Sequence, residues 1–229
     1  MAIARSDTPF SNTRDPADLY NQAFFTDQFN GQRFDAGDLA VLFHSWEGSD
    51  AVMTVTDDQG VTWTMPTLAK VKHTTEEFYL GAWVIWNAAD TPERVGQVVA
   101  DVLVPNRSTV GGRYSGARTA SNPFIEVKSS EGSAVSSLAS PSINPGAAGR
   151  VISATAVFGG GRTFTGADLR LDGDGRLALY DKSASGATTI TGSWSGGTAK
   201  ALTLALAFVD NTATSGVITV SGTPRLVIV

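Results

Sequence analysis

The stretch Ala51 to Trp63, with the sequence AVMTVTDDQGVTW, constrains the fold of this chain more than any other feature. Residues 52–56 alternate between two faces with the period of two that is typical of a β-strand. The segment Asp57 to Gly60 predicts a tight turn, because aspartates hydrogen-bond the local backbone and Gly60 tolerates a positive φ. β-Favouring residues resume from Val61 to Met65. We therefore expect strand, turn and strand here, and the rest of the chain follows the same pattern.

The composition excludes several kinds of site. The 229-residue chain has no cysteine and only two histidines, His44 and His73. Disulfides and thiolate metal sites are therefore excluded, and a histidine-rich metal centre is disfavoured. The net charge is −5 and no basic stripe occurs, so we expect no nucleic-acid partner.

The sequence also lacks signals for a membrane. No apolar run reaches the roughly 18 residues of a membrane span. The first residues, MAIARSDTPFSNTRD, contain no apolar segment of the Sec type, so we expect synthesis and folding in a cytoplasm. Charged residues are sparse while Gly, Ser, Thr and Ala are abundant. This balance favours a β-rich protein that buries part of its surface in an assembly.

Composition divides the chain into four segments. Asp15-Pro16 favours a helix start, which predicts a short helix from Ala17 to Phe25 inside an N-terminal arm. Arg113 begins a stretch rich in Ser, Ala, Gly and Pro. A disordered linker is one interpretation of it; we favour extended connections and edge strands, because apolar anchors recur there. The segments are residues 1–35 (arm with short helix), 36–112 (first β half), 113–149 (connector) and 150–229 (second β half).

The N-terminal arm carries aromatic residues that suit a docking role. The assembly candidates are Phe10, Phe24 and Phe25. In one interpretation this segment plugs an open end of its own sandwich, and in the other it docks onto a neighbouring subunit. Both interpretations stay open from the sequence.

Several runs predict strands of an all-β fold. Leu39 to Trp46 is largely apolar, and Phe78 to Trp86 is the most apolar run, which predicts a strand in the middle of a sheet. The second half repeats the order of strands and turns after about 110 residues, which suggests an internal pseudo-repeat. The halves would form either two stacked sandwiches or one sandwich with interleaved sheets. The predicted class is an all-β, antiparallel β-sandwich of jelly-roll type with two similar halves.

Acidic and catalytic motifs are weak. Asp172 and Asp174 are weak candidates for calcium, but their Asp-Gly-Asp-Gly string lacks the later glutamate of an EF-hand loop and favours a hairpin turn. His44 and Ser45 would point to opposite faces of a strand, and no Gly-x-Ser-x-Gly motif occurs. We therefore expect no enzymatic activity, no cofactor and no catalytic residue.

The aromatic residues offer a second kind of candidate site. They form either the core or a platform on which a sugar stacks, and the second requires an exposed ring. Trp83 and Trp86 have opposite parity on their strand, so one of them is expected to face outward. The ligand-binding candidates are Trp83, Trp86, Trp194 and Tyr180.

Two sets of motifs carry a resemblance. The segment Thr56 to Trp63 resembles the Asp-box hairpin of sialidases, a structural turn that lies away from their active site. A second set of motifs, between Gly37 and Phe124, is similar to a pattern in virion proteins of tailed bacteriophages. In order along the chain these motifs are GDLAVLFHSW, VTDDQGVTW, YSG and SNPF. This resemblance implies a non-enzymatic β-sandwich protein of the minor tail, tail-tip or capsid-decoration type.

The resemblance sets the functional expectation. We expect a virion component that acts through contacts with other virion proteins and forms a homo-oligomer. The alternative is a carbohydrate-binding or host-receptor-binding adhesin that contacts a cell-surface glycan. The two functions are compatible in one protein.

Overall fold

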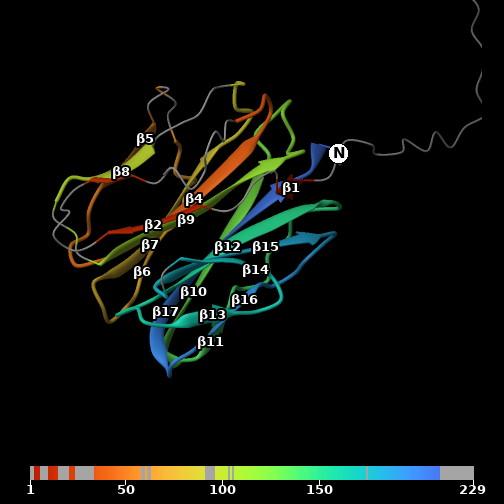
Figure 1. The fold of residues 1–229 in the computed structure, drawn as a ribbon. Coiled ribbons are helices and arrows are strands. Elements are labelled where there is room, and N and C mark those ends of the chain that lie inside the picture. The colour runs from red at the N-terminus through yellow and green to blue at the C-terminus, as the bar shows by residue number, and fades with distance from the viewer. Residues whose placement is uncertain are drawn as a thin grey trace, which may run out of the picture.

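The computed structural model describes residues 3–5, 10–14, 21–23, 34–57, 60, 63–90, 96–102, 104, 106–173 and 175–211. In this part of the chain the protein is all-β, and its strands form four antiparallel sheets (Figure 1). The predicted all-β class is therefore confirmed. No helix of the described residues is long and apolar enough to cross a membrane.

Strands β1 to β9, which we call the first half from here on, form one large and one small sheet, and β1 to β3 come from the predicted arm. The large sheet has the order β1-β9-β4-β7-β6, and β2 also pairs with β9; the small sheet has the order β3-β8-β5. The strands are β1 (Ala4–Arg5), β2 (Phe10–Arg14), β3 (Asn21–Ala23), β4 (Leu39–Glu47), β5 (Met53–Asp57), β6 (Lys70–Lys72), β7 (Phe78–Ile85), β8 (Gly96–Ala100) and β9 (Arg107–Ser115).

Strands β10 to β17, which we call the second half from here on, repeat this organisation, and β10 and β11 come from the predicted connector. The large sheet of this half has the order β10-β17-β12-β15-β14 and its small sheet the order β11-β16-β13. The strands are β10 (Phe124–Val135), β11 (Ser137–Ala139), β12 (Gly149–Val157), β13 (Thr163–Thr165), β14 (Leu169–Gly173), β15 (Leu177–Ala184), β16 (Thr191–Ser195) and β17 (Ala199–Val209).

The pairing within each half is nested. In the first half β2 pairs with β9, β3 with β8 and β4 with β7. In the second half β10 pairs with β17, β11 with β16 and β12 with β15. Three further ladders correspond, since β4 pairs with β9 as β12 does with β17, β5 with β8 as β13 does with β16, and β6 with β7 as β14 does with β15. The ladder between β1 and β9 has no counterpart among the described strands of the second half. Among the described residues no sheet mixes strands of the two halves, so the halves do not interleave.

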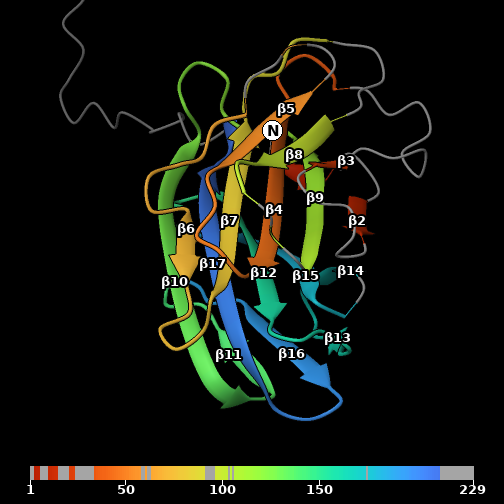
Figure 2. The same cartoon turned by 90° about the vertical axis from the view of Figure 1, so that its left-hand side faces the viewer.

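Three apolar clusters hold the layers together. The central cluster contains side chains from both large sheets and lies between them; their strands overlap in the view of Figure 2. The other two lie between each large sheet and the small sheet of its own half. On β4, Val41 belongs to the central cluster while its neighbour Leu42 faces the small sheet, because successive side chains point to opposite faces.

Burial on both faces explains why the predictions of β4 and β7 are confirmed. Every residue of both strands is buried. A strand that is covered on both faces is apolar along its whole length, and both strands lie inside the sheet rather than at its edge. The expectation of an edge strand in the connector is confirmed as well, because β10 lies at the edge of its sheet.

The predicted N-terminal helix is wrong where the structure describes it. Asn21–Ala23 form β3, which pairs with residues 97–99 of β8. A two-turn helix is marginal in water, whereas the edge of the small sheet provides partners for backbone groups. Residues 17–20 and 24–25, and with them Phe24 and Phe25, lie outside the described residues.

Among the described residues, the strands predicted at 51–63 do not pair with each other as a hairpin, but each pairs with a different strand. Strand β5 pairs with β8, and Thr64 forms a bridge with Val84 of β7. Gly60 has the expected positive φ of 71°, and Trp63 is buried. Asp57 ends β5, and Asp58 and Gln59 lie outside the described part.

Candidate functional site

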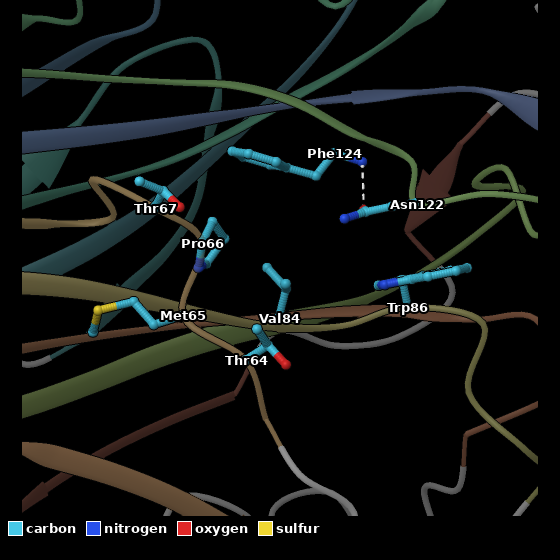
Figure 3. A pocket seen from close by; sticks show the side chains of 8 residues that line it. All are labelled: Thr64, Met65, Pro66, Thr67, Val84, Trp86, Asn122 and Phe124. Atoms are coloured by element: carbon cyan, nitrogen blue, oxygen red, sulfur yellow. Dashed lines mark hydrogen bonds between the residues drawn. The ribbon is translucent and has the colours of Figure 1, made fainter.

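A pocket of about 260 Å³ opens between the two halves of the chain (Figure 3). Its lower side comes from β7 and from the loop that precedes β6, and its upper side comes from the residues that lead into β10. The lining residues are Thr64, Met65, Pro66, Thr67, Val84, Trp86, Asn122 and Phe124. All eight side chains are uncharged.

Backbone hydrogen bonds fix the lower side of the pocket. Thr64 and Val84 exchange two of them, with N···O distances of 3.0 and 2.8 Å. The loop then turns at Pro66, whose carbonyl oxygen accepts from the amide of Ala69 at 3.0 Å. Leu68, inside this turn, has a φ of 66° and is 78% exposed. The loop therefore holds a leucine in a backbone conformation that favours glycine or asparagine.

Two side-chain donors point into this pocket. The Oδ1 atom of Asn122 accepts from the backbone amide of Phe124 at 3.0 Å, which fixes the orientation of the side-chain amide. Its Nδ2 atom therefore faces the space above Val84 (Figure 3). The indole Nε1 of half-buried Trp86 faces the same space, and no described residue accepts a hydrogen bond from it.

The upper wall is anchored in the central core. The rings of Phe124 and Phe208 meet edge to face with centroids 6.0 Å apart. Phe124, Trp86 and Met65 all pack against the central cluster without being fully buried. The pocket therefore has a firm apolar floor and a rim that carries donors.

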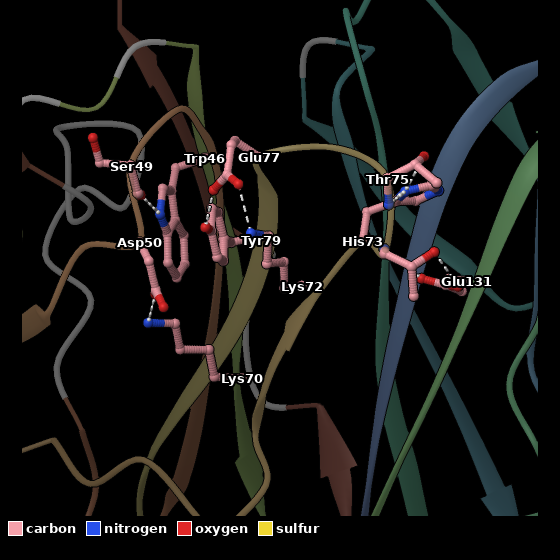
Figure 4. A network of polar contacts seen from close by, with 11 residues as sticks. Trp46, Ser49, Asp50, Lys70, Lys72, His73, Thr75, Glu77, Tyr79 and Glu131 are labelled. Atoms are coloured by element: carbon pink, nitrogen blue, oxygen red, sulfur yellow. Dashed lines mark hydrogen bonds and ion pairs between the residues drawn. The ribbon is translucent and has the colours of Figure 1, made fainter.

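A second cluster combines aromatic rings and lysines (Figure 4). The rings of Trp46 and Tyr79 stack with centroids 5.2 Å apart and an interplanar angle of 10°. The Nζ atom of Lys70 lies 5.4 Å from the centre of Trp46 and also pairs with Asp50. Because both rings are buried, this cluster closes the surface over the aromatic stack instead of offering a platform.

Glu77 ties the same cluster together electrostatically. It accepts from Lys72 at 2.6 Å and from the hydroxyl of Tyr79. The hydrogen bond from Lys72 holds the pKa of Glu77 below its usual value, and the pKa of Lys72 is raised in return. Burial, and then the bond to Glu77, raise the pKa of Tyr79. The tyrosine hydroxyl therefore stays protonated as a donor.

The two histidines have structural partners. The Nδ1 atom of His73 accepts from the amide of Thr75 at 3.2 Å, so its Nε2 carries the proton that it donates to the carbonyl oxygen of Gly132 at 3.3 Å. This bond joins the first half to β10. His44 is fully buried, and its Nδ1 lies 2.8 Å from the hydroxyl of Thr109. Burial, and then the charge of Arg107, lower the pKa of His44 to about 3.

The structure separates the four aromatic candidates. Trp83, Trp194 and Tyr180 are buried in the clusters beneath the small sheets. Trp86, which directly follows β7, packs against the central cluster on the other side of the sheet from Trp83, so the two rings lie on opposite faces. Trp86 is half-buried there and does not face fully outward. A surface platform would therefore rest on Trp86.

The described carboxylates of Asp172 and Asp181 accept hydrogen bonds from backbone amides or pair with arginines. The carboxylate of Asp172 accepts from the amides of Phe164 and Gly175, each at 3.0 Å, which is the role of a turn residue. Asp174 lies outside the described residues. Asp181 is fully buried and pairs with Arg150 and Arg170. Among the described residues no group of three metal-ligating side chains occurs.

The assembly candidates are placed only in part. The backbone of Phe10 pairs with Gly111 on β9 of the same chain. Sequence reasoning missed Asn122 and Phe124 as pocket residues, and missed Ile3 as a core residue. The SNPF motif contains the first two, but the sequence alone did not indicate that it faces Trp86.

Comparison of the chain with protein-family models finds no match, and comparison with curated proteins finds none either.

Proposed function

We propose that the protein is a non-enzymatic structural component of a tailed-bacteriophage particle, of the minor tail, tail-tip or capsid-decoration type. The observation that carries this proposal is the nested pairing within each half, of β2 with β9, β3 with β8 and β4 with β7, and of β10 with β17, β11 with β16 and β12 with β15. We take each half to be a β-sandwich of jelly-roll type, because that fold is a long hairpin rolled into two sheets. Jelly rolls are frequent in viral coat proteins, so the support is an analogy of fold.

The way in which such a protein works is association. Two similar halves that share one apolar cluster already bury large sheet faces against each other within one chain. We expect copies of the whole chain to associate as a homo-oligomer and to contact other virion proteins. No chemical step is part of this function.

The proposal is tested on the particles themselves. Phage particles are induced from the bacterium that carries the coding sequence, purified by density gradient, and examined by mass spectrometry and immunogold electron microscopy. Stoichiometric presence and gold at one position on the particle support the proposal. Protein that is abundant in the lysate but absent from intact particles contradicts it.

The role of the N-terminal arm is tested separately. Ala4 and Ser115 are opposite each other on β1 and β9, and the chain has no cysteine of its own. Oxidation of the Ala4→Cys, Ser115→Cys double variant yields a covalent dimer if the arm docks onto a neighbouring subunit. It yields only an internally linked monomer if the arm stays on its own subunit. The mass of the unmodified protein in solution is recorded in parallel.

A second candidate function is binding of a host glycan. The observation that favours it is the pocket beside Trp86, where an aromatic ring and two N–H donors meet. Jelly rolls also occur in lectins. Saturable binding of the labelled protein to a glycan array, removed by Trp86→Ala, supports this candidate, and binding that survives the substitution contradicts the site.

A further inference from the structure

We propose that the pocket beside Trp86 binds the acetamido group and one ring face of an N-acetylhexosamine. This inference rests on the second candidate function, glycan binding, and names its ligand. The two donors in the pocket, Trp86 Nε1–H and Asn122 Nδ2–H, indicate what the ligand must offer.

The two donors complement a ligand that accepts hydrogen bonds. An indole nitrogen only donates, and the hydrogen bond from the backbone amide of Phe124 to Oδ1 of Asn122 turns the donor end of that side chain toward the pocket. A carbonyl group only accepts, so the acetamido oxygen of an N-acetylated sugar complements two converging donors better than a hydroxyl does. The hydroxyls of Thr64 and Thr67, also in the lining, are able to donate or accept and suit the ring hydroxyls.

The apolar surfaces fit the remaining parts of such a sugar. Val84 and Met65 form a floor on which the acetamido methyl group would be removed from water. The rings of Trp86 and Phe124 offer faces for the C–H side of a pyranose. A plain hexose has no acetamido group, so it would lose the carbonyl oxygen that accepts from the two donors and the methyl group that packs on Val84 and Met65.

Charge and size narrow the ligand further. All eight lining side chains are uncharged, so the pocket offers no ion-pair partner for a phosphate or a carboxylate. A volume of about 260 Å³ lies below the usual range for drug-sized ligands and suits one ring with one substituent. A neutral N-acetylated monosaccharide unit is the ligand class that meets both conditions.

The test uses the full-length protein and saturation-transfer NMR. N-Acetylglucosamine and N-acetylgalactosamine are compared with glucose, galactose and N-acetylglycine amide, a peptide-like carbonyl. We expect millimolar binding of an N-acetylated sugar, as suits a ligand of about 15 non-hydrogen atoms. Plain hexoses should bind at least about tenfold more weakly.

Two substitutions isolate the donors. Trp86→Phe keeps an aromatic ring and removes the N–H, while Asn122→Asp keeps the acceptor for Phe124 and removes the side-chain donor. Each should weaken binding about tenfold. Val52→Ala, at an exposed apolar residue outside the pocket lining, is the matched control and should leave binding unchanged. Thermal melting of each variant excludes loss of the fold as the cause.

Each outcome decides the inference. Equal binding of glucose overturns the acetamido assignment, and preferential binding of N-acetylglycine amide points to a peptide ligand and also overturns it. If neither variant weakens sugar binding, the assignment of the ligand to this pocket is overturned, while glycan binding as a function of the protein is retained. Failure to bind N-acetylated sugars overturns the inference; a glycan array probed with the same preparation then shows whether glycan binding falls with it.

Discussion

The backbone amide of Ile3 donates a hydrogen bond to the carboxylate of Asp210 at 2.9 Å, across almost the whole described chain. The carbonyl oxygen of Ile3 accepts from Nε of Arg150 at 3.1 Å. Its side chain is 2% exposed and belongs to the central cluster. The beginning of the arm is therefore part of the core that the two halves share.

Truncation of Ile3 should therefore destabilise the protein. Ile3→Ala should lower the free energy of unfolding by about 2–4 kcal/mol, because it removes buried methyl groups and leaves a cavity. Ile3→Val should cost only about 1 kcal/mol. Urea unfolding followed by tryptophan fluorescence measures both. Equal stability of Ile3→Ala and the parent protein would show that this residue is not in the core in solution.

Asp181 should be among the residues least tolerant of substitution. Its buried carboxylate pairs with Arg150 and with Arg170, whose Nε lies 3.0 Å from Oδ1. Asp181→Asn keeps the size but leaves the arginines without their counter-charge, which should cost about 3–5 kcal/mol. Differential scanning calorimetry measures the loss. Asp50→Asn, at an exposed ion pair with Lys70, is the control and should cost less than about 1 kcal/mol.

The two halves should unfold together. Leu80 of β7 and Leu204 of β17 lie in the same central cluster, so separation of the halves would expose an apolar face on each. We expect one cooperative transition for the whole chain. The isolated fragments 1–117 and 118–229 should bind a hydrophobic dye and recombine when mixed. Two separate transitions in calorimetry of the whole chain would contradict this coupling.

The sequence predicts β4 and β7 well because burial of a strand determines which residue types occur along that strand. β4 and β7 are buried along their whole length and are largely apolar. The positive φ at residue 60 is likewise predictable, because glycine is the residue type that adopts it most readily. The pairing partner of a strand, in contrast, cannot be predicted from the residue types of that strand alone. β5 pairs with β8 rather than with the segment that follows it, since the small sheet is assembled from strands far apart in the chain.

The pocket shows the same limit. Parity alone separates Trp83 from Trp86, which is a local property of one strand. The opposing residues Asn122 and Phe124 come from a different half, and only the stacking of the large sheets brings them to Trp86. Ile3 is a comparable case, because one apolar residue in a polar segment carries no periodicity.

Relief of backbone strain at Leu68 should stabilise the protein. A leucine with a φ of 66° is less favourable than asparagine there, and its side chain is 78% exposed. Leu68→Asn should raise the free energy of unfolding by about 0.5–1 kcal/mol. Val52→Asn removes a similarly exposed apolar side chain at a residue without a positive φ and should bring no gain. A loss of stability in Leu68→Asn would instead show that contacts of the leucine side chain within the fold outweigh the strain of its backbone.

His44 should make the protein sensitive to moderate acid. Burial lowers the pKa of His44 to about 3 in the folded protein, while an unfolded imidazole titrates near 6.5. Between these values the unfolded chain binds more protons, so the free energy of unfolding falls as the pH drops through this window. The contribution of His44 should be a loss of about 2 kcal/mol by pH 5. His44→Phe keeps a ring that can stack on Trp46 and removes the titrating group. Urea unfolding at pH 7 and pH 5 should therefore show a smaller loss in the variant, and an equal loss in both proteins would mean that carboxylates cause the acid sensitivity.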